Sequence, residues 1–193
     1  ESDFYTNMYK SVYNLVDGDA VAFGFTHMAS ARQVLAENLA PPSPRHCILT
    51  PAHATKFMVE TKGLYHDGSQ IAEQYREGKL GKIQGADVWE NSIFGNHTTG
   101  TAVKTSLYTV NGATESGSTI TIQTGTTTFL VGDVVTFAGA YAVHPETKVS
   151  TGVLKQFVVT ADSGANATSL AISPALTISG PSQNVTGYPT NVG

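Results

Sequence analysis

The sequence is poor in cysteine, in charge of either sign and in long apolar runs. Its single cysteine, Cys47, excludes a disulfide framework and a zinc site built from paired cysteines, and one unpaired thiol fits a reducing compartment. A net charge of −4 provides no general basic field that would hold nucleic acid. No apolar run approaches membrane-spanning length, and no secretory signal is recognisable. A chain of 193 residues can still bury a core without a covalent staple.

Motifs typical of catalysis are also scarce. His46 and Cys47 are adjacent in a predicted strand, so their side chains point to opposite faces and cannot pair as base and nucleophile. His66 and Asp67 have no second pair at metal-ligand spacing, and no phosphate-binding loop or HExxH motif occurs. We therefore expect no catalytic residue, no cofactor and no metal site. An enzyme with Cys47 or His66 as its reactive centre remains the minor alternative.

Composition divides the chain into two parts. Residues 1–97 carry 19 of the 26 charged side chains and five threonines, whereas residues 98–193 carry seven charged side chains and 20 threonines. Threonine is β-branched and favours strands. The sequence therefore predicts a boundary near Gly95–Gly100, with a mixed helical region before it and an all-β module after it.

Hydrophobic periodicity predicts an α+β order of elements in the first part. An apolar stripe of Phe4, Met8, Val12 and Leu15 predicts a helix with this stripe facing a core. The remaining predicted elements are a helix capped by Thr26 that runs to about Leu39, a strand over Arg45–Thr50, a helix that begins at Pro51 and frays near Gly63, a short helix around Ser69–Glu77, and one or two strands within Lys82–Phe94.

Six short strands separated by turn residues predict a closed barrel or sandwich in the second part. The predicted strands are Ser106–Val110, Ser118–Gln123, Val134–Phe137, Val153–Thr160, Thr168–Ile172 and Leu176–Ile178. Ile120 and Ile122 alternate with threonines, which indicates one buried and one solvated face. Gly139 is expected to close the third strand, and the polar connection Ala140–Gly152 follows it.

Three segments, in order, resemble one known family. They are HMASARQVLAENLAPPSPRHCILTP, GLYHDGSQIAEQYREGKLGKIQGADVWENS and VGDVVTFAGAYAVHPETKVSTGVLKQFVVTADSGANATSLAISPAL. The phrases FAGAYAVHPETK and LKQFVVT in the third segment are the most specific. The chain resembles the major capsid (coat) protein of tailed double-stranded DNA phages, in the group with an inserted β-barrel, the I-domain.

The resemblance implies an α+β major capsid fold with an inserted all-β barrel. It assigns residues 1–24 to the end of the P-domain spine helix and its connection, and residues 25–98 to the A-domain. Residues 99–185 would be the inserted barrel, and residues 186–193 the return to the A-domain. Because the family has an N-terminal arm, an E-loop and later strands, we expect this sequence to be an internal piece of a longer chain.

The resemblance also implies function and partners. Subunits of the family assemble as pentamers and hexamers into an icosahedral shell that encloses the double-stranded DNA genome. The implied partners are further copies of the chain, a scaffolding protein, the portal and other virion proteins, with non-specific proximity to packaged DNA and no membrane. The implied location is the virion, after assembly in the host cytoplasm.

The connection between the two central predicted strands is the candidate inter-subunit contact. Some relatives carry a long charged loop early in the barrel, but the corresponding turn here, Asn111–Gly117, is short. The connection Ala140–Gly152 is therefore the better candidate, with Tyr141, His144, Glu146 and Lys148 as its contact residues. An ordinary surface loop is an equally weighted interpretation of the same residues.

A virion-associated or adhesion β-domain that binds glycan or protein is the alternative function. An exposed aromatic platform would favour it. The aromatic residues of the strand region are Tyr108, Phe129, Phe137, Tyr141 and Phe157, and most of them alternate inward.

Overall fold

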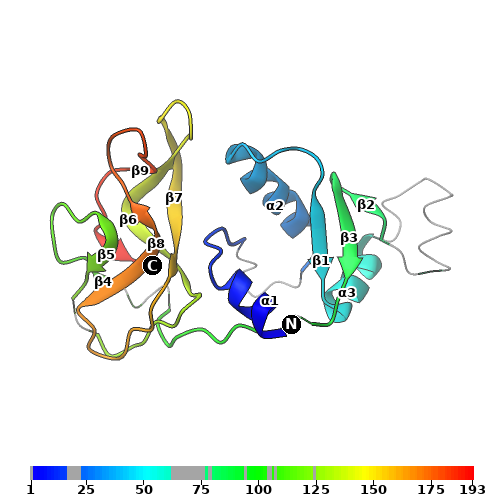
Figure 1. Cartoon of the computed structure of the whole chain (residues 1–193), viewed down its shortest axis with the longest axis horizontal. Helices are drawn as coiled ribbons and strands as arrows, with labels where there is room; N and C mark the ends of the chain where they lie inside the picture. Colours follow the sequence, from blue (N-terminus) through cyan, green and yellow to red (C-terminus); the bar gives the residue numbers. More distant parts are fainter. Residues whose placement is uncertain are drawn as a thin grey trace. The chain divides into compact units, whose positions relative to one another are not determined.

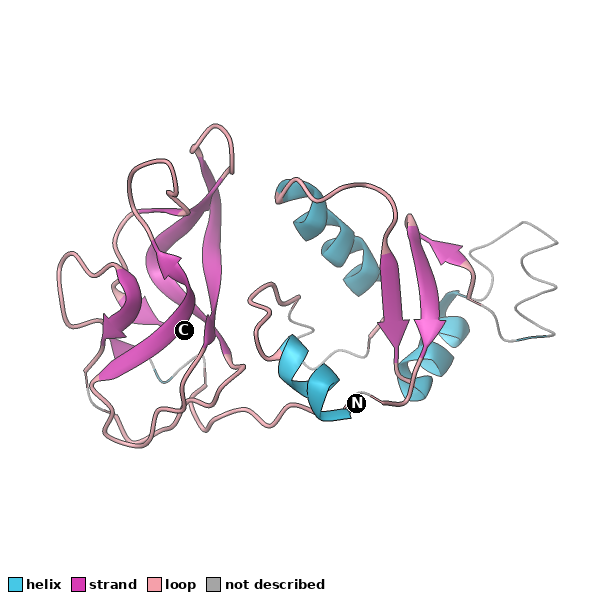
Figure 2. Cartoon of the chain, in the orientation of Figure 1, coloured by secondary structure: helices cyan, strands magenta, loops and turns pink. Residues whose placement is uncertain are grey.

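The computed structural model describes residues 2–16, 23–61, 77, 80–93, 95–103, 106, 108–123 and 125–193. Contacts divide the chain into two compact units. The first, called the β unit, combines the chain up to Leu15 with Gly95–Gly193, and the second, called the α/β unit, is Val16–Phe94. The chain passes into the β unit next to the compositional boundary, and Figure 2 shows strands as the regular structure of the part after it.

The described residues of the α/β unit include two helices and a small sheet. Its elements are α2 (Phe25–Glu37), β1 (His46–Leu49), α3 (Pro51–Thr61), β2 (Lys82–Ile83) and β3 (Ala86–Glu90). The strand order is β1-β3-β2, with β1 parallel and β2 antiparallel to β3. Its core joins both helices to the sheet through Met28, Leu49, Ala54, Phe57 and Ile83.

The N-termini of α2 and α3 were both predicted from capping residues. The prediction that Thr26 caps α2 is wrong, because the helix begins at Phe25 and Gly24 precedes it. The Gly24 N–H donates to His27 Nδ1 at 3.1 Å, so a ring three residues along closes the first turn. The start of α3 at Pro51 is confirmed, and the Ala54 N–H donates to the Thr50 carbonyl. The predicted helix around residues 69–77 lies outside the described residues except for Glu77.

In its described residues, the β unit contains one short α-helix and a curled sheet (Figure 1). Its elements are α1 (Ser2–Tyr9), β4 (Tyr108–Thr109), β5 (Gly117–Thr121), β6 (Val134–Val143), β7 (Ser150–Val159), β8 (Ser169–Leu176), β9 (Val185–Thr186) and β10 (Asn191–Val192). The strand order is β4-β10-β6-β7-β8-β5, and β9 pairs with β6. The two end strands meet, because Val110 forms a bridge with Ile122 directly beyond β4 and β5.

Strand boundaries differ from the prediction at several places, and one strand pairing lies beyond the residues assigned to the barrel. Gly139 does not close a strand: β6 continues to Val143 through a register shift, and Gly139 has φ +87°, so the glycine permits a bulge. The strand predicted over 168–172 continues as β8 to Leu176, where the strand predicted over 176–178 was expected to begin. Residues 186–193, which the resemblance assigns to the A-domain, contain Asn191 and Val192, and these pair with β4 in the curled sheet.

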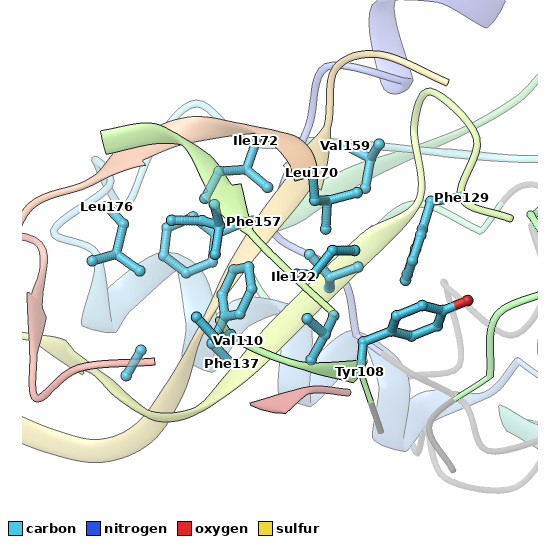
Figure 3. Packing of buried hydrophobic residues seen from close by; sticks show 14 of the residues in the cluster. Tyr108, Val110, Ile122, Phe129, Phe137, Phe157, Val159, Leu170, Ile172 and Leu176 are labelled. Carbon is cyan, nitrogen blue, oxygen red and sulfur yellow. The ribbon is translucent and has the colours of Figure 1, made fainter. Parts of the chain in front are cut away.

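The core of the β unit is built from large apolar side chains (Figure 3). The rings of Phe137 on β6 and Phe157 on β7 meet edge to face, with centroids 5.4 Å apart, and both are fully buried. Ile120 and Ile122 are buried as their alternation predicted. Each such side chain stabilises the fold by about 1.5–3 kcal/mol relative to an exposed position.

The N-terminal segment, residues 2–16, packs with its tyrosines rather than with its apolar stripe. Phe4, Met8, Val12 and Leu15 are between 48% and 68% exposed, so the prediction that they face a core is wrong. The helix ends at Tyr9, where the Ser11 hydroxyl and N–H both donate to the Met8 carbonyl. Beyond the helix the Val12 N–H donates to the Tyr9 carbonyl, and further along the Leu15 backbone bonds to the side chain of Gln156 on β7.

Candidate functional site at the β6–β7 hairpin

The hairpin of β6 and β7 is longer, and its connection shorter, than the sequence indicates. Antiparallel pairs run from Val134–Val158 to Tyr141–Leu154 and Val143–Ser150. The connecting turn is therefore residues 144–149 rather than 140–152, and the His144 N–H closes it by donating to the Val149 carbonyl at 2.9 Å. Figure 1 draws this hairpin in yellow, with the turn at its tip.

His144 organises the turn from within. Its Nδ1 accepts hydrogen bonds from the backbone N–H groups of Glu146 and Thr147, each at 3.3 Å. Its carbonyl accepts from the Lys148 N–H at 3.0 Å. The imidazole acts here as an acceptor for the backbone, so the geometry supports a structural role for His144 inside the candidate contact loop.

Lys148 ties the turn to a second loop. Its backbone has φ +58°, a left-handed conformation that is uncommon outside glycine. Its Nζ donates to the carbonyl of Gln183 at 3.2 Å, and Gln183 lies just before β9. Glu146, in contrast, is exposed. Of the two charged candidates, Glu146 is therefore the one presented to solvent, while the ammonium group of Lys148 is engaged.

The apolar surface of the hairpin was missed by sequence reasoning. Val149 and Val153 are 65% and 62% exposed, and Tyr141 on the neighbouring strand is 41% exposed. The first four residues of β7, from Ser150 to Val153, are all exposed. In the sequence, Ser150 to Val153 do not alternate between apolar and polar residues. This pattern indicates a strand without a buried face. The hairpin tip therefore combines apolar side chains with the exposed carboxylate of Glu146.

A second polar cluster, also missed, lies where the chain enters the β unit. His97 Nε2 lies 2.9 Å from Asp133 Oδ1, and Asp133 Oδ2 accepts from the N–H groups of Leu130 at 2.8 Å and Gly100 at 3.0 Å. The Asp133 carboxylate thus stabilises the turn of residues 130–133 and connects it to the segment 97–100. The turn signal at Gly132 and Asp133 was visible in the sequence, but its partners 33 and 36 residues away were not.

The N-terminal segment reaches the same region and the base of the hairpin. The Tyr9 ring meets the His97 ring edge on, and its hydroxyl donates to the Gly95 carbonyl at 3.4 Å. Gln156 on β7 forms two hydrogen bonds with the backbone of Leu15. Its side chain accepts from the Leu15 N–H at 2.9 Å and donates to the Leu15 carbonyl at 2.8 Å. These contacts fix residues 9–15 against the β unit.

Lys155 completes this contact. Its Nζ lies 4.8 Å from the centroid of the Tyr13 ring, within the range of a cation–π interaction. Burial lowers the pKa of Lys155, because the charged ammonium loses solvation there. The lysine therefore contributes both packing and charge to the attachment of residues 9–15.

Of the residues considered as catalytic candidates, the structure describes His46 and Cys47. His46 is exposed on β1 and Cys47 is half-buried on the same strand, packed against the core of the α/β unit. Burial raises the pKa of the Cys47 thiol, which favours its protonated, less nucleophilic form. His66 lies outside the described residues. Within the described ranges, no three His, Cys, Asp or Glu side chains come together in a way that could hold a metal ion.

The aromatic residues of the strand region bear on the glycan-binding alternative. Tyr108, Phe129, Phe137 and Phe157 are buried in the core, and Tyr141 alone of the five predicted aromatics is exposed. A polar cleft of about 290 Å³ is lined by Ser106, Tyr108, Thr109, Gln123 and Thr127, among others. The Tyr108 hydroxyl in this cleft is bonded to the backbone of Thr127. These five aromatics therefore form no exposed platform.

No protein-family model matches the chain, and no curated protein matches it. A solved structure, the CUS-3 coat protein I-domain, is similar to this chain at 28% sequence identity with a TM-score of 0.33. The match covers 47% of this chain and 97% of the solved one. No helix in the described part of the chain is long and apolar enough to span a membrane.

Proposed function

We propose that this chain is part of the major capsid protein of a tailed double-stranded DNA phage, with the β unit as its inserted I-domain. The observation that carries the proposal is the ordered resemblance of three segments to that family. The most specific segment covers β6, the turn and β7, which make up the longest strand pair of the β unit. A structural role also suits a chain whose central feature is packing surface rather than a reactive cluster.

In this proposal, many copies of the chain assemble into pentamers and hexamers of an icosahedral shell. A scaffolding protein guides assembly, and the portal and other virion proteins join the same shell around the packaged genome. Because the net charge of the chain is −4, the shell encloses the DNA without tight binding of the DNA by each subunit. Small contacts suffice, because symmetry repeats each contact around a closed ring.

The tip of the β6–β7 hairpin is the proposed contact with a neighbouring subunit. Val149, Val153 and Tyr141 supply exposed apolar surface, and Glu146 supplies an exposed charge at its rim. The internal bonds of His144 and Lys148 hold the turn in one shape before contact, which lowers the entropy cost of association. The four predicted contact residues thus divide into two that present surface and two that maintain the turn.

Co-expression with the cognate scaffolding protein tests the proposed function. The full-length protein that carries this sequence is produced with and without the scaffold, and products are separated by sedimentation and viewed by electron microscopy. We expect closed shells with a protruding β unit on every subunit when the scaffold is present. A protein that remains monomeric with the scaffold present would contradict the proposal.

A further inference from the structure

The turn that follows β4 contains a pair of residues with a chemistry of its own. Asn111 is followed by Gly112, and this is the one place among the nine asparagines of the sequence where glycine comes next. The pair lies where the end strands of the curled sheet meet: the Asn111 N–H donates to the Thr121 carbonyl at 2.8 Å, beside the Val110–Ile122 bridge. Changes at this pair therefore act on the closure of the sheet.

Two groups in this pair are free to react. Within the described residues, the side-chain amide of Asn111 has no hydrogen-bond partner, and neither does the backbone N–H of Gly112. Both residues are exposed. The side chains of Asn38, Asn91 and Asn184, in contrast, are held by hydrogen bonds to the backbone. Gly112 has no Cβ to obstruct the approach of its nitrogen to the Asn111 side chain.

A fixed carboxylate lies beside the pair. A Cβ placed on Gly112 would come within 2.6 Å of Glu115 Oε1, so this oxygen sits directly over the glycine. The other oxygen, Oε2, accepts from the Thr121 N–H at 3.2 Å, which holds the carboxylate in place. The carboxylate does not accept from the Gly112 N–H in this conformation, so it takes that proton either when the exposed turn moves or through one intervening water.

We propose that Asn111–Gly112 is a site of spontaneous deamidation that Glu115 promotes in the folded chain. The Gly112 nitrogen attacks Cγ of Asn111, forming an N–C bond. The C–NH₂ bond breaks, and the amide leaves as ammonia with the proton taken from Gly112. Water then adds to one carbonyl of the resulting succinimide and opens the ring to aspartate or isoaspartate. The inference is independent of the proposed function.

The product changes the closure of the sheet. Aspartate at position 111 places a new negative charge close to Glu115, and isoaspartate also adds a methylene group to the backbone path next to the Val110–Ile122 bridge. Both products weaken the pairing of the end strands, isoaspartate more strongly because it alters the spacing of the backbone donors. Ageing of the protein therefore loosens the β unit at one defined position.

Peptide mapping by mass spectrometry, combined with isoaspartate detection, tests this proposal on the whole chain. Wild type, Gly112→Ala and Glu115→Gln are incubated at neutral pH, once folded and once in denaturant. Glu115→Gln keeps an oxygen acceptor for Thr121 and removes the base. Gly112 has no positive φ that alanine would strain, but the new Cβ displaces the Glu115 carboxylate, so the effect of the methyl group itself is taken from the denatured chain. Folding of each variant is checked by circular dichroism.

We expect residue 111 to convert before the other asparagines in folded wild type. Gly112→Ala should slow conversion roughly tenfold or more in both conditions, because the added methyl group raises the barrier to attack. Glu115→Gln should slow it in the folded chain and leave the denatured rate unchanged. The proposal is overturned if another asparagine converts first, or if the folded Glu115→Gln chain converts as fast as folded wild type.

Discussion

The two halves of the β6–β7 hairpin have the same antiparallel pairing and opposite surroundings. In the inner half, Val135, Phe137 and Phe157 are buried among the large side chains of the core. In the outer half, beyond the bulge at Gly139, Val149 and Val153 are mostly exposed. The inner half therefore stabilises the unit. In the outer half, Ala140 and Val143 on β6 are still buried, whereas the turn and the start of β7 have apolar surface that contributes little to folding.

The hairpin therefore places its contribution to stability and its exposed apolar surface in different parts of the same strand pair. Burial of apolar area supplies most of the folding free energy, so the inner half cannot vary without loss of stability. Folding does not remove the exposed apolar side chains at the tip from water. Their burial lowers the free energy only when the tip associates with another molecule. Substitutions in the inner half should consequently change stability, and substitutions at the tip should change assembly.

The largest expected effect is in the inner half. Phe157→Ala removes a fully buried ring that packs on Phe137, so the free energy of unfolding should fall by about 3–5 kcal/mol. Denaturant titration followed by circular dichroism measures this. Val153→Ala on the same strand is the matched control and should change stability by less than about 0.5 kcal/mol. Equal losses for the two variants would remove the distinction between the halves.

A smaller loss is expected at the entry to the β unit. Asp133→Ala removes the acceptor for the Leu130 and Gly100 N–H groups and the partner of His97, so stability should fall by about 2 kcal/mol. Asp133→Asn keeps one acceptor oxygen and should lose less. Thermal melts of the three proteins give the order, and an Asn variant as unstable as the Ala variant would contradict this account of the carboxylate.

At the base of the hairpin, Gln156→Ala should release the N-terminal segment. The variant loses both hydrogen bonds to Leu15, at a cost of about 1 kcal/mol, and hydrogen exchange should become faster across residues 9–16. Gln156→Glu retains the acceptor for the Leu15 N–H and should show an intermediate exchange rate. Unchanged exchange in Gln156→Ala would mean that the tyrosine contacts alone hold the segment.

The smallest effect on stability, with the largest on assembly, is expected at the tip. Val149→Asp combined with Val153→Asp should change the free energy of unfolding by less than about 0.5 kcal/mol, because both side chains are mostly exposed. Shell yield in the co-expression assay should nevertheless fall sharply, because a charge replaces apolar contact surface on every subunit. Val103→Asp is the control, since Val103 is 61% exposed elsewhere in the β unit.

Much of the fold could be predicted from local patterns. Alternation placed Ile120 and Ile122 in the core, and Thr50–Pro51 marked the start of α3. The role of Gly139 could not be predicted, because a positive φ serves a turn and a bulge equally well. Strands β9 and β10 have two residues each, which is too short for a periodic signal.

The orientation of the N-terminal segment and the surface of the candidate site were also beyond the sequence. Periodicity identified the stripe of Phe4 and Met8 but could not show that the tyrosine side would pack instead. The candidate residues Tyr141, His144, Glu146 and Lys148 lie on β6 and in the turn between β6 and β7. The exposed valines beside them depend on how far the hairpin extends past its neighbours, and pairing over long sequence distances decides that.

Cryo-electron microscopy of shells assembled from the full-length protein tests the central claim most directly. The account predicts that residues 144–153 lie against a neighbouring subunit, with Val149 and Val153 covered, while Phe137 and Phe157 stay inside their own β unit. Shells in which the hairpin tip is surrounded by solvent would contradict the assignment of the outer half to subunit contact.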